Sequence, residues 1–173
     1  MKLFSFPSRF PPLPYPDAFM VVFSCNANTA KSIMQSKCIR KYVLDGVETT
    51  PASAVSAVTP TTSGRHILYF WLNKAERLIS NVDVSYVRIP ENPPYLHGAF
   101  IYNSWSISRI DFLAATPPTV DKNNFGIGYG TRSIYIRCPK GSYAAYDYWI
   151  KNNIPNWLKN NAVLSETNDF SFS

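Results

Sequence analysis

Long apolar runs alternate with polar turns in the first half of the chain. Residues 18–25, AFMVVFSC, predict a strand that is apolar almost throughout. Residues 65–73, RHILYFWLN, predict the strongest strand, and its six consecutive apolar residues indicate burial on both faces of a sheet. Between these two strands, Asp45-Gly46 favours the tight turn of a β-hairpin over residues 39–49.

Weaker patterns fill the rest of this region. Residues 28–37, NTAKSIMQSK, predict a short helix, because Asn28 suits an N-cap and Ala30, Ile33 and Met34 fall on one face. Residues 51–64 are small and polar, and they predict a weak strand or a loop. We therefore expect residues 18–84 to form a small β domain of the sandwich or half-barrel type.

Three short strands recur between residues 85 and 140: YVRIP, RIDFL and SIYIRCP. Each strand contains a pair of apolar residues two positions apart. In the second strand Asp111 lies between the two apolar residues, so its side chain is expected to face solvent. The apolar pairs follow one another at steps of 23 and 24 residues, and a near-fixed step is typical of a solenoid with one strand per turn. The predicted core pairs are Val87 with Ile89, Ile110 with Phe112, and Ile134 with Ile136.

The segments around these strands fit a short solenoid over residues 85–140. Pro117-Pro118 favours an extended connector, and Phe125 is expected to return from it into the core. Residues 141–153 predict a helix with Ser142 as its N-cap, which ends before Pro155. Residues 141–173 are thus expected to be a capping helix followed by an irregular tail. The apolar stripe of that helix is Ala145, Tyr146, Trp149 and Ile150.

A proline-rich arm occupies residues 1–17. Five prolines between Pro7 and Pro16 favour an extended path without internal hydrogen bonds, so the arm is ordered only where it lies on another surface. That surface is either its own domain or a neighbouring chain, and the spaced aromatic residues favour the neighbour. The aromatic anchors are Phe4, Phe6, Phe10 and Tyr15.

Composition limits the partners. The chain has 173 residues, one medium domain or two small ones, and 46% of them are hydrophobic. The net charge of +6 is spread thinly, with no dense basic stripe, so we expect no nucleic-acid binding. No apolar run is long enough to predict a membrane span, and no ordinary secretory signal precedes the prolines. The three cysteines are expected to be buried thiols, with one bridge such as Cys25–Cys38 as the alternative.

No catalytic pattern accompanies these elements. The two histidines, His66 and His97, do not share a metal-binding motif, and a structural role is expected for His66. Nothing pairs the carboxylates of Glu91, Asp111 and Asp121, and no nucleophile motif is present. We therefore expect a protein that is not an enzyme and needs neither a metal nor another cofactor.

These residues resemble the terminal repeats of BspA-type bacterial surface leucine-rich-repeat proteins. The resemblance covers about residues 18–155 and implies that Phe100 belongs to the repeat core. It also implies a small β domain before the repeats and a helix that closes them. The matching segments are Gly98-Ala99-Phe100, the strand at Ile110 and Phe112, Thr116–Thr119, Asn124-Phe125, Ile134–Pro139, Gly141-Ser142, Tyr146 and Trp149, and upstream Asp45–Glu48 and Thr62–His66.

The chain departs from that family in its short array, in NSWSIS where a repeat consensus is expected, and in the arm. The expected fold is mainly β with short helices (α+β), and the expected function is structural. Our first hypothesis is a component of a larger assembly, such as a bacteriophage head fibre, decoration or tail protein, anchored in the virion through the arm. The alternative is an adhesin at a bacterial surface that binds a host protein or glycan through Tyr102, Trp105, Tyr129 and Tyr135.

Overall fold

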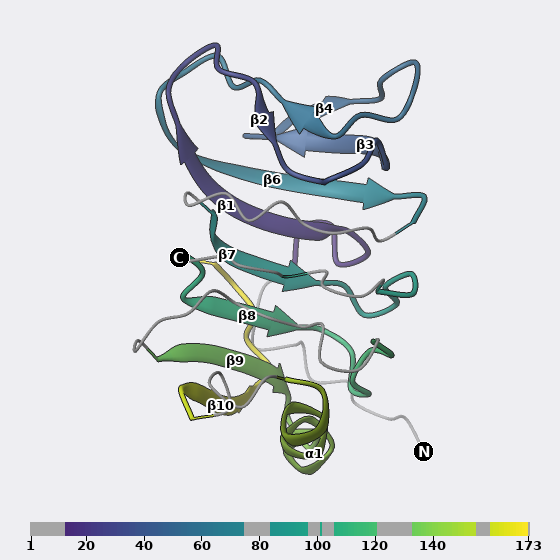
Figure 1. Cartoon of the computed structure of the whole chain (residues 1–173), viewed down its shortest axis with the longest axis vertical. Helices are drawn as coiled ribbons and strands as arrows, with labels where there is room; N and C mark the ends of the chain where they lie inside the picture. Colours follow the sequence, from purple (N-terminus) through teal and green to yellow (C-terminus); the bar gives the residue numbers. More distant parts are fainter. Residues whose placement is uncertain are drawn as a thin grey trace, which may run out of the picture.

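One large mixed sheet dominates the computed structural model, which describes residues 13–74, 84–96, 101, 106–120, 133–154 and 160–172 (Figure 1). Its strands run in the order β10-β9-β8-β7-β1-β6-β3-β4. They are β1 (Phe19–Cys25), β3 (Ile39–Leu44), β4 (Val47–Thr49), β6 (Gly64–Leu72), β7 (Val84–Ile89), β8 (Arg109–Phe112), β9 (Ile134–Pro139) and β10 (Ala162–Thr167). A two-stranded ladder, β2 (Lys31–Ser32) with β5 (Ala57–Val58), and the helix α1 (Tyr143–Asn153) complete the described elements.

The sheet has an antiparallel half and a parallel half, and β1 joins them. β1 pairs antiparallel with β6 on one side and with β7 on the other, whereas β7, β8, β9 and β10 run parallel to one another. The sheet is therefore continuous across the predicted boundary between residues 84 and 85. The prediction of a mainly β fold is confirmed. In the described residues, the expected small β domain consists of strands of the large sheet together with the two-stranded β2–β5 sheet.

Most of the core lies on one face of this sheet, which we call the core face. Alternate residues of each strand point to it, as the period of two requires. Every predicted repeat-core residue that the structure describes is buried there, and Phe100 and Phe125 lie outside the described residues. The six buried residues are Val87, Ile89, Ile110, Phe112, Ile134 and Ile136.

The register between the last two predicted strands differs from the expected one. Val87 lies opposite Ile110 and Ile89 opposite Phe112, as predicted, but Ile110 lies opposite Ile136 and not Ile134. A shift by two residues keeps every side chain on its face, so apolar periodicity cannot distinguish the two registers. In the observed register Arg137 comes opposite Asp111, and this polar pair decides between them.

Residues 28–37 do not form the predicted helix. Asn28 adopts a left-handed φ of 56°, so it begins a turn and does not act as an N-cap. β2 then pairs with β5, and the N–H groups of Ile33 and Met34 both donate to the carbonyl of Ser56. Pairing with the predicted weak strand thus outweighs a marginal helix propensity, because so short a helix has little stability of its own.

The sequence predicted burial on both faces for residues 65–73, which form β6, but the structure shows it for β1. Phe19 to Phe23 are all buried, whereas β6 alternates, with Ile67, Tyr69 and Trp71 only partly covered. β1 lies in the middle of the sheet and β6 nearer its β4 edge, where less of the chain covers the second face. The predicted hairpin is confirmed, with Asp45 and Gly46 at φ values of 49° and 87°.

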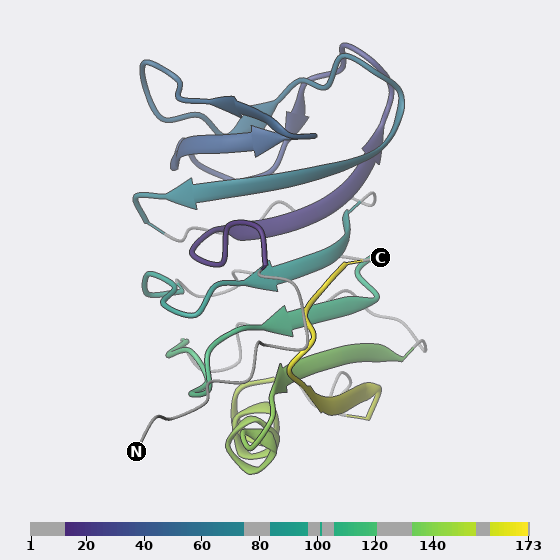
Figure 2. The same cartoon turned by 180° about the vertical axis from the view of Figure 1, so that it is seen from behind.

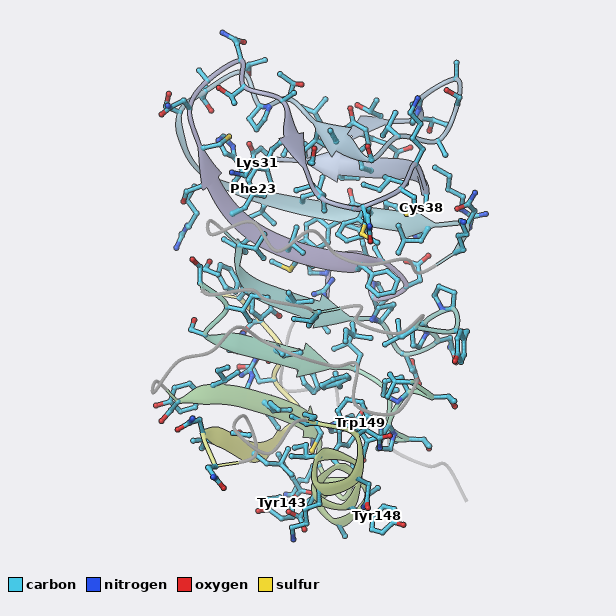
Figure 3. All side chains as sticks on the ribbon, viewed as in Figure 1. Phe23, Lys31, Cys38, Tyr143, Tyr148 and Trp149 are labelled. Carbon is cyan, nitrogen blue, oxygen red and sulfur yellow. The ribbon has the colours of Figure 1, made fainter. Side chains whose placement is uncertain are left out.

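Helix α1 packs at the β10 end of the sheet, as a cap was predicted to do (Figure 1). Tyr146, Trp149 and Ile150 are buried as expected, but Ala145 is exposed. Trp149 points toward the sheet in Figure 3 and donates from its indole nitrogen to the carbonyl of Pro118 at 2.9 Å. The Tyr146 hydroxyl donates to the carbonyl of Ala114 at 2.8 Å, so the helix is bonded to the segment after β8 at Ala114 and at Pro118.

The start of α1 is capped by a residue that the sequence did not single out. Ser142 precedes the helix, but its side chain makes no capping hydrogen bond. Glu166 Oε1 accepts instead from the backbone N–H groups of Gly141 and Tyr143, at 2.8 and 2.7 Å. Glu166 belongs to β10, which extends into the tail that was expected to be irregular and pairs in parallel with β9.

Because this carboxylate satisfies two backbone donors at a helix start, Glu166→Ala should lower the free energy of unfolding by about 1 kcal/mol. Urea denaturation monitored by circular dichroism would measure the change. Ser142→Ala is the matched comparison and should cost less, because no side-chain cap is lost. A larger loss from Ser142→Ala than from Glu166→Ala would contradict this assignment.

Candidate functional site

The face of the sheet opposite the core carries a set of arginines, and we call it the arginine face. In adjacent strands Arg88, Asp111 and Arg137 lie directly opposite one another, from β7 through β8 to β9. A second row on the same face joins Tyr86, Arg109 and Tyr135. Cross-strand neighbours at these positions are close enough for direct side-chain contact. The strands thus place one carboxylate among three guanidinium groups.

Asp111 is the centre of this face. It is fully buried, and Arg137 donates to both of its carboxylate oxygens at 2.7 and 2.6 Å. Arg109 donates to the same two oxygens at 3.2 and 3.1 Å, and the Tyr86 hydroxyl donates at 2.7 Å. The prediction that Asp111 faces solvent is therefore wrong. Its two oxygens accept five hydrogen bonds from these side chains, an arrangement that indicates a structural role.

The ionisation behaviour of its neighbours follows from this arrangement. The hydrogen bonds from Arg137 to Asp111 raise the pKa of the Arg137 guanidinium. Burial, followed by the charge and the hydrogen bond of Asp111, raises the pKa of the Tyr86 hydroxyl well above its usual value. Both shifts favour the protonated groups that Asp111 needs as donors. Burial also lowers the pKa of Arg88, which has no carboxylate within ion-pair distance among the described residues.

Arg88 holds the root of the predicted arm. Its side chain is buried, and Nη2 donates to the carbonyls of Pro14 and Tyr15 at 2.8 and 3.0 Å. Tyr15 in turn packs against Tyr69 and Trp71, with ring centroids 5.0 and 5.6 Å away. This last aromatic residue of the arm therefore lies on the chain's own sheet. Phe4, Phe6 and Phe10 lie outside the described residues.

The C-terminal segment crosses the same face, as Figure 2 shows for the yellow trace over β9, β8 and β7. The Phe172 ring lies 4.7 Å from that of Tyr86, and the Arg109 guanidinium lies 5.6 Å from Phe172. Arg137 stacks over Phe170 at 5.6 Å, and Arg109 also donates to the carbonyl of Ser171. Cation–π contacts of this kind let aromatic rings cover charged groups without removing their charge.

Of the predicted binding surface, the structure describes Tyr135. Tyr102, Trp105 and Tyr129 lie outside the described residues. Tyr135 is 53% exposed at the margin of the arginine face, beside the exposed Val163 of β10. Further exposed aromatic side chains, which the sequence did not single out, lie elsewhere on the molecule: Tyr95, Tyr143 and Tyr148. The last two lie on the outer side of α1 in Figure 3.

The residues considered for chemistry are dispersed or structural. His66 is buried and its Nδ1 lies 2.7 Å from Asp45 Oδ2, while His97 and Asp121 lie outside the described residues. The three cysteines are thiols, and Cys25 is only half-buried, so the expectation of burial holds for Cys38 and Cys138. Within the described residues no group of three or more His, Cys, Asp and Glu side chains could hold a metal ion.

Comparisons with known proteins assign no class. No protein-family model matches the chain, and no curated protein or solved structure matches it. Within the described segments no helix has the length and apolar character of a membrane span. The residues on the arginine face are therefore the main guide to what this protein does.

Replacing Asp111 should be strongly destabilising, because it leaves Arg109 and Arg137 without their counter-charge. Asp111→Asn should lower the free energy of unfolding by about 3 kcal/mol, the lower part of the range for breaking a buried ion pair, since both arginines are partly exposed. Denaturant unfolding measures the loss. Glu91→Gln removes an exposed carboxylate from the loop after β7 and should leave the midpoint unchanged. Equal effects of the two substitutions would contradict the structural role of Asp111.

Cysteine reactivity should follow burial. Burial, with a smaller contribution from Glu166, raises the pKa of the Cys138 thiol to about 11, so little reactive thiolate exists at pH 8. In folded protein at pH 8, iodoacetamide should modify the half-buried Cys25 before Cys38 and Cys138. Peptide mapping by mass spectrometry over time gives the order, and guanidinium should make all three react alike. Early modification of Cys138 would show that the β9–β10 region opens readily.

Proposed function

We propose that this protein is a non-enzymatic structural module that joins a larger assembly through its N-terminal arm, with a bacteriophage virion as the assembly we favour. The observation that carries the proposal is the attachment of the arm's root. A buried arginine binds two consecutive backbone carbonyls, Pro14 and Tyr15, and two aromatic rings flank Tyr15. A segment that only trails in solvent has no use for a buried cation at its base.

The arm is suited to this task because of its composition. Phe4, Phe6 and Phe10 precede the anchored root within a proline-rich stretch. Such a stretch loses little conformational entropy when it binds, because its prolines already restrict the backbone. Aromatic side chains in turn supply much of the binding energy at protein interfaces. A fixed root would transmit load from these anchors directly to the centre of the sheet.

We also propose that residues 85–140 form a short leucine-rich-repeat-like solenoid. Two observations support it: β7, β8 and β9 are consecutive parallel neighbours, and Leu96 and Val120 form a second parallel bridge outside those strands. In a solenoid, successive turns are neighbours at more than one point of each turn. Leu96 is fully buried and Val120 packs against the same core, as residues on the other side of a turn would be.

The arm's role can be tested with the full chain by analytical ultracentrifugation. Wild-type protein should sediment with a mass well above 19.6 kDa, and Phe4→Ser/Phe6→Ser/Phe10→Ser should return it to the monomer without changing its thermal midpoint. Tyr95→Ser is the matched control, because it removes an exposed aromatic residue outside the arm. A wild-type monomer with the phenylalanine side chains protected on its own sheet would contradict the proposal.

A surface adhesin is the second candidate, and the exposure of Tyr135 favours it. Its ring stands at 53% exposure beside Val163 and next to two arginines, an arrangement that can contact a host protein or a glycan. This role needs the β9–β10 margin and not the arm. Tyr135→Ala would therefore abolish cell binding and leave the sedimentation behaviour unchanged, whereas the triple arm variant would do the reverse.

A further inference from the structure

A hollow lies beside the β3–β4 hairpin, at the end of the sheet far from α1. It has a volume of about 220 Å³, roughly seven times the volume that a water molecule occupies in the liquid. It lies between the hairpin and the segment that joins β5 to β6, and a small ring or the end of a chain would fill it. The lining residues are Tyr42, Leu44, Asp45, Val47, Thr49, Thr59 and Thr61.

Asp45 is a fixed acceptor at the edge of this hollow. Its backbone N–H donates to the carbonyl of Ile67, and its Oδ1 accepts from the N–H of Ile67 at 2.9 Å. Its Oδ2 lies 2.7 Å from His66 Nδ1, which carries the hydrogen because the carboxylate can only accept. The side chain is nevertheless 42% exposed. Each carboxylate oxygen has two lone pairs, so one on each remains for a ligand.

Hydroxyl groups complete the polar lining. Within the described part of the chain, no hydrogen bond engages the side-chain hydroxyls of Tyr42, Thr49, Thr59 and Thr61. Each hydroxyl can both donate and accept. The Tyr42 ring, Leu44 and Val47 supply the apolar surface, and Val47, which is 68% exposed, is accessible to a ligand. The site therefore combines apolar contact with several two-way hydrogen-bonding groups and one fixed acceptor.

This chemistry matches a neutral polyhydroxylated ring. Every hydroxyl of a saccharide can donate to a carboxylate and exchange hydrogen bonds with threonines, while its C–H face packs on aromatic and aliphatic side chains. Asp45 is the single charged residue in the described lining, so an anionic ligand would meet repulsion. Lys41 does not line the hollow: it alternates with Tyr42 along β3, pairs with Glu48 at 3.0 Å and stacks on Trp71.

We propose that this hollow binds one neutral monosaccharide unit, either a free sugar or the end of a glycan. Asp45 accepts hydrogen bonds from two ring hydroxyls, Thr49 and Thr61 orient the remaining hydroxyls, and Val47 contacts the ring face. The site is separate from the arm and from the arginine face, so it adds a binding activity to the proposed structural role and does not depend on it.

The test uses the full chain and a panel of neutral methyl glycosides of glucose, galactose, mannose and N-acetylglucosamine. At least one should shift the backbone amide resonances of Asp45, Thr59 and Thr61 in a saturable titration followed by nuclear magnetic resonance. Thr49→Val/Thr61→Val removes two hydroxyls and keeps the side-chain shape, so it should weaken that binding about tenfold. Methyl glucuronide should bind more weakly than methyl glucoside, because its carboxylate approaches Asp45.

Thr50→Val/Thr62→Val is the matched control, since these exposed threonines are sequence neighbours of the first pair but do not line the hollow. It should leave the affinity unchanged. The inference is overturned if no glycoside in the panel shifts these amides, if both double variants weaken binding equally, or if the glucuronide binds as well as the glucoside. Sedimentation of the triple arm variant is independent of all three outcomes, so failure here and failure of the structural role remain distinguishable.

Discussion

The buried Asp111 carboxylate is the interaction on which the parallel half of the sheet depends. Arg137 and Arg109 donate to both of its oxygens, and Tyr86 adds a third residue from a further strand. The group thereby joins β7, β8 and β9 side by side. A buried carboxylate is costly to desolvate unless its lone pairs are filled, and the observed register brings both cross-strand partners, Tyr86 and Arg137, to it. The arginine face thus determines the register of these strands, which the interchangeable apolar residues on the core face do not determine.

The same arrangement explains why both ends of the described chain lie on one face. Arginines whose charge is only partly balanced by one carboxylate need further partners, and they find carbonyl oxygens and aromatic rings. Arg88 takes the carbonyls of Pro14 and Tyr15, while Arg109 takes Ser171 and the ring of Phe172. The arm's root and the C-terminal segment are therefore held by hydrogen bonds and cation–π contacts from these arginines in addition to aromatic packing. In the proposed structural role, the arm would therefore extend from a root that is fixed to the sheet by hydrogen bonds.

Sequence patterns predicted the strands well and the arginine face poorly. The alternation in YVRIP, RIDFL and SIYIRCP correctly placed six apolar residues in the core, because each has one environment available to it. Asp111 was expected in solvent because nothing local reveals that a distant tail covers the second face. A partial signal was nevertheless present: Arg88 and Asp111 are the middle residues of YVRIP and RIDFL, and opposite charges at matching positions favour pairing. β10, the cap formed by Glu166 and the pairing of β2 with β5 could not be predicted, because each depends on neighbours far away in the sequence.

The position of β1 has a consequence for biosynthesis. This strand is apolar on both faces, and both of its partners, β6 and β7, follow it by several tens of residues. At a synthesis rate of roughly 5–20 residues per second, β1 leaves the ribosome seconds before either partner exists. During that interval FMVVF is a short, uncharged segment of high β propensity, the kind that pairs with other chains. Chaperone occupancy or rapid translation through β6 would decide the yield of soluble protein, and changes that slow synthesis between β1 and β7 would cause aggregation without altering the native state at all.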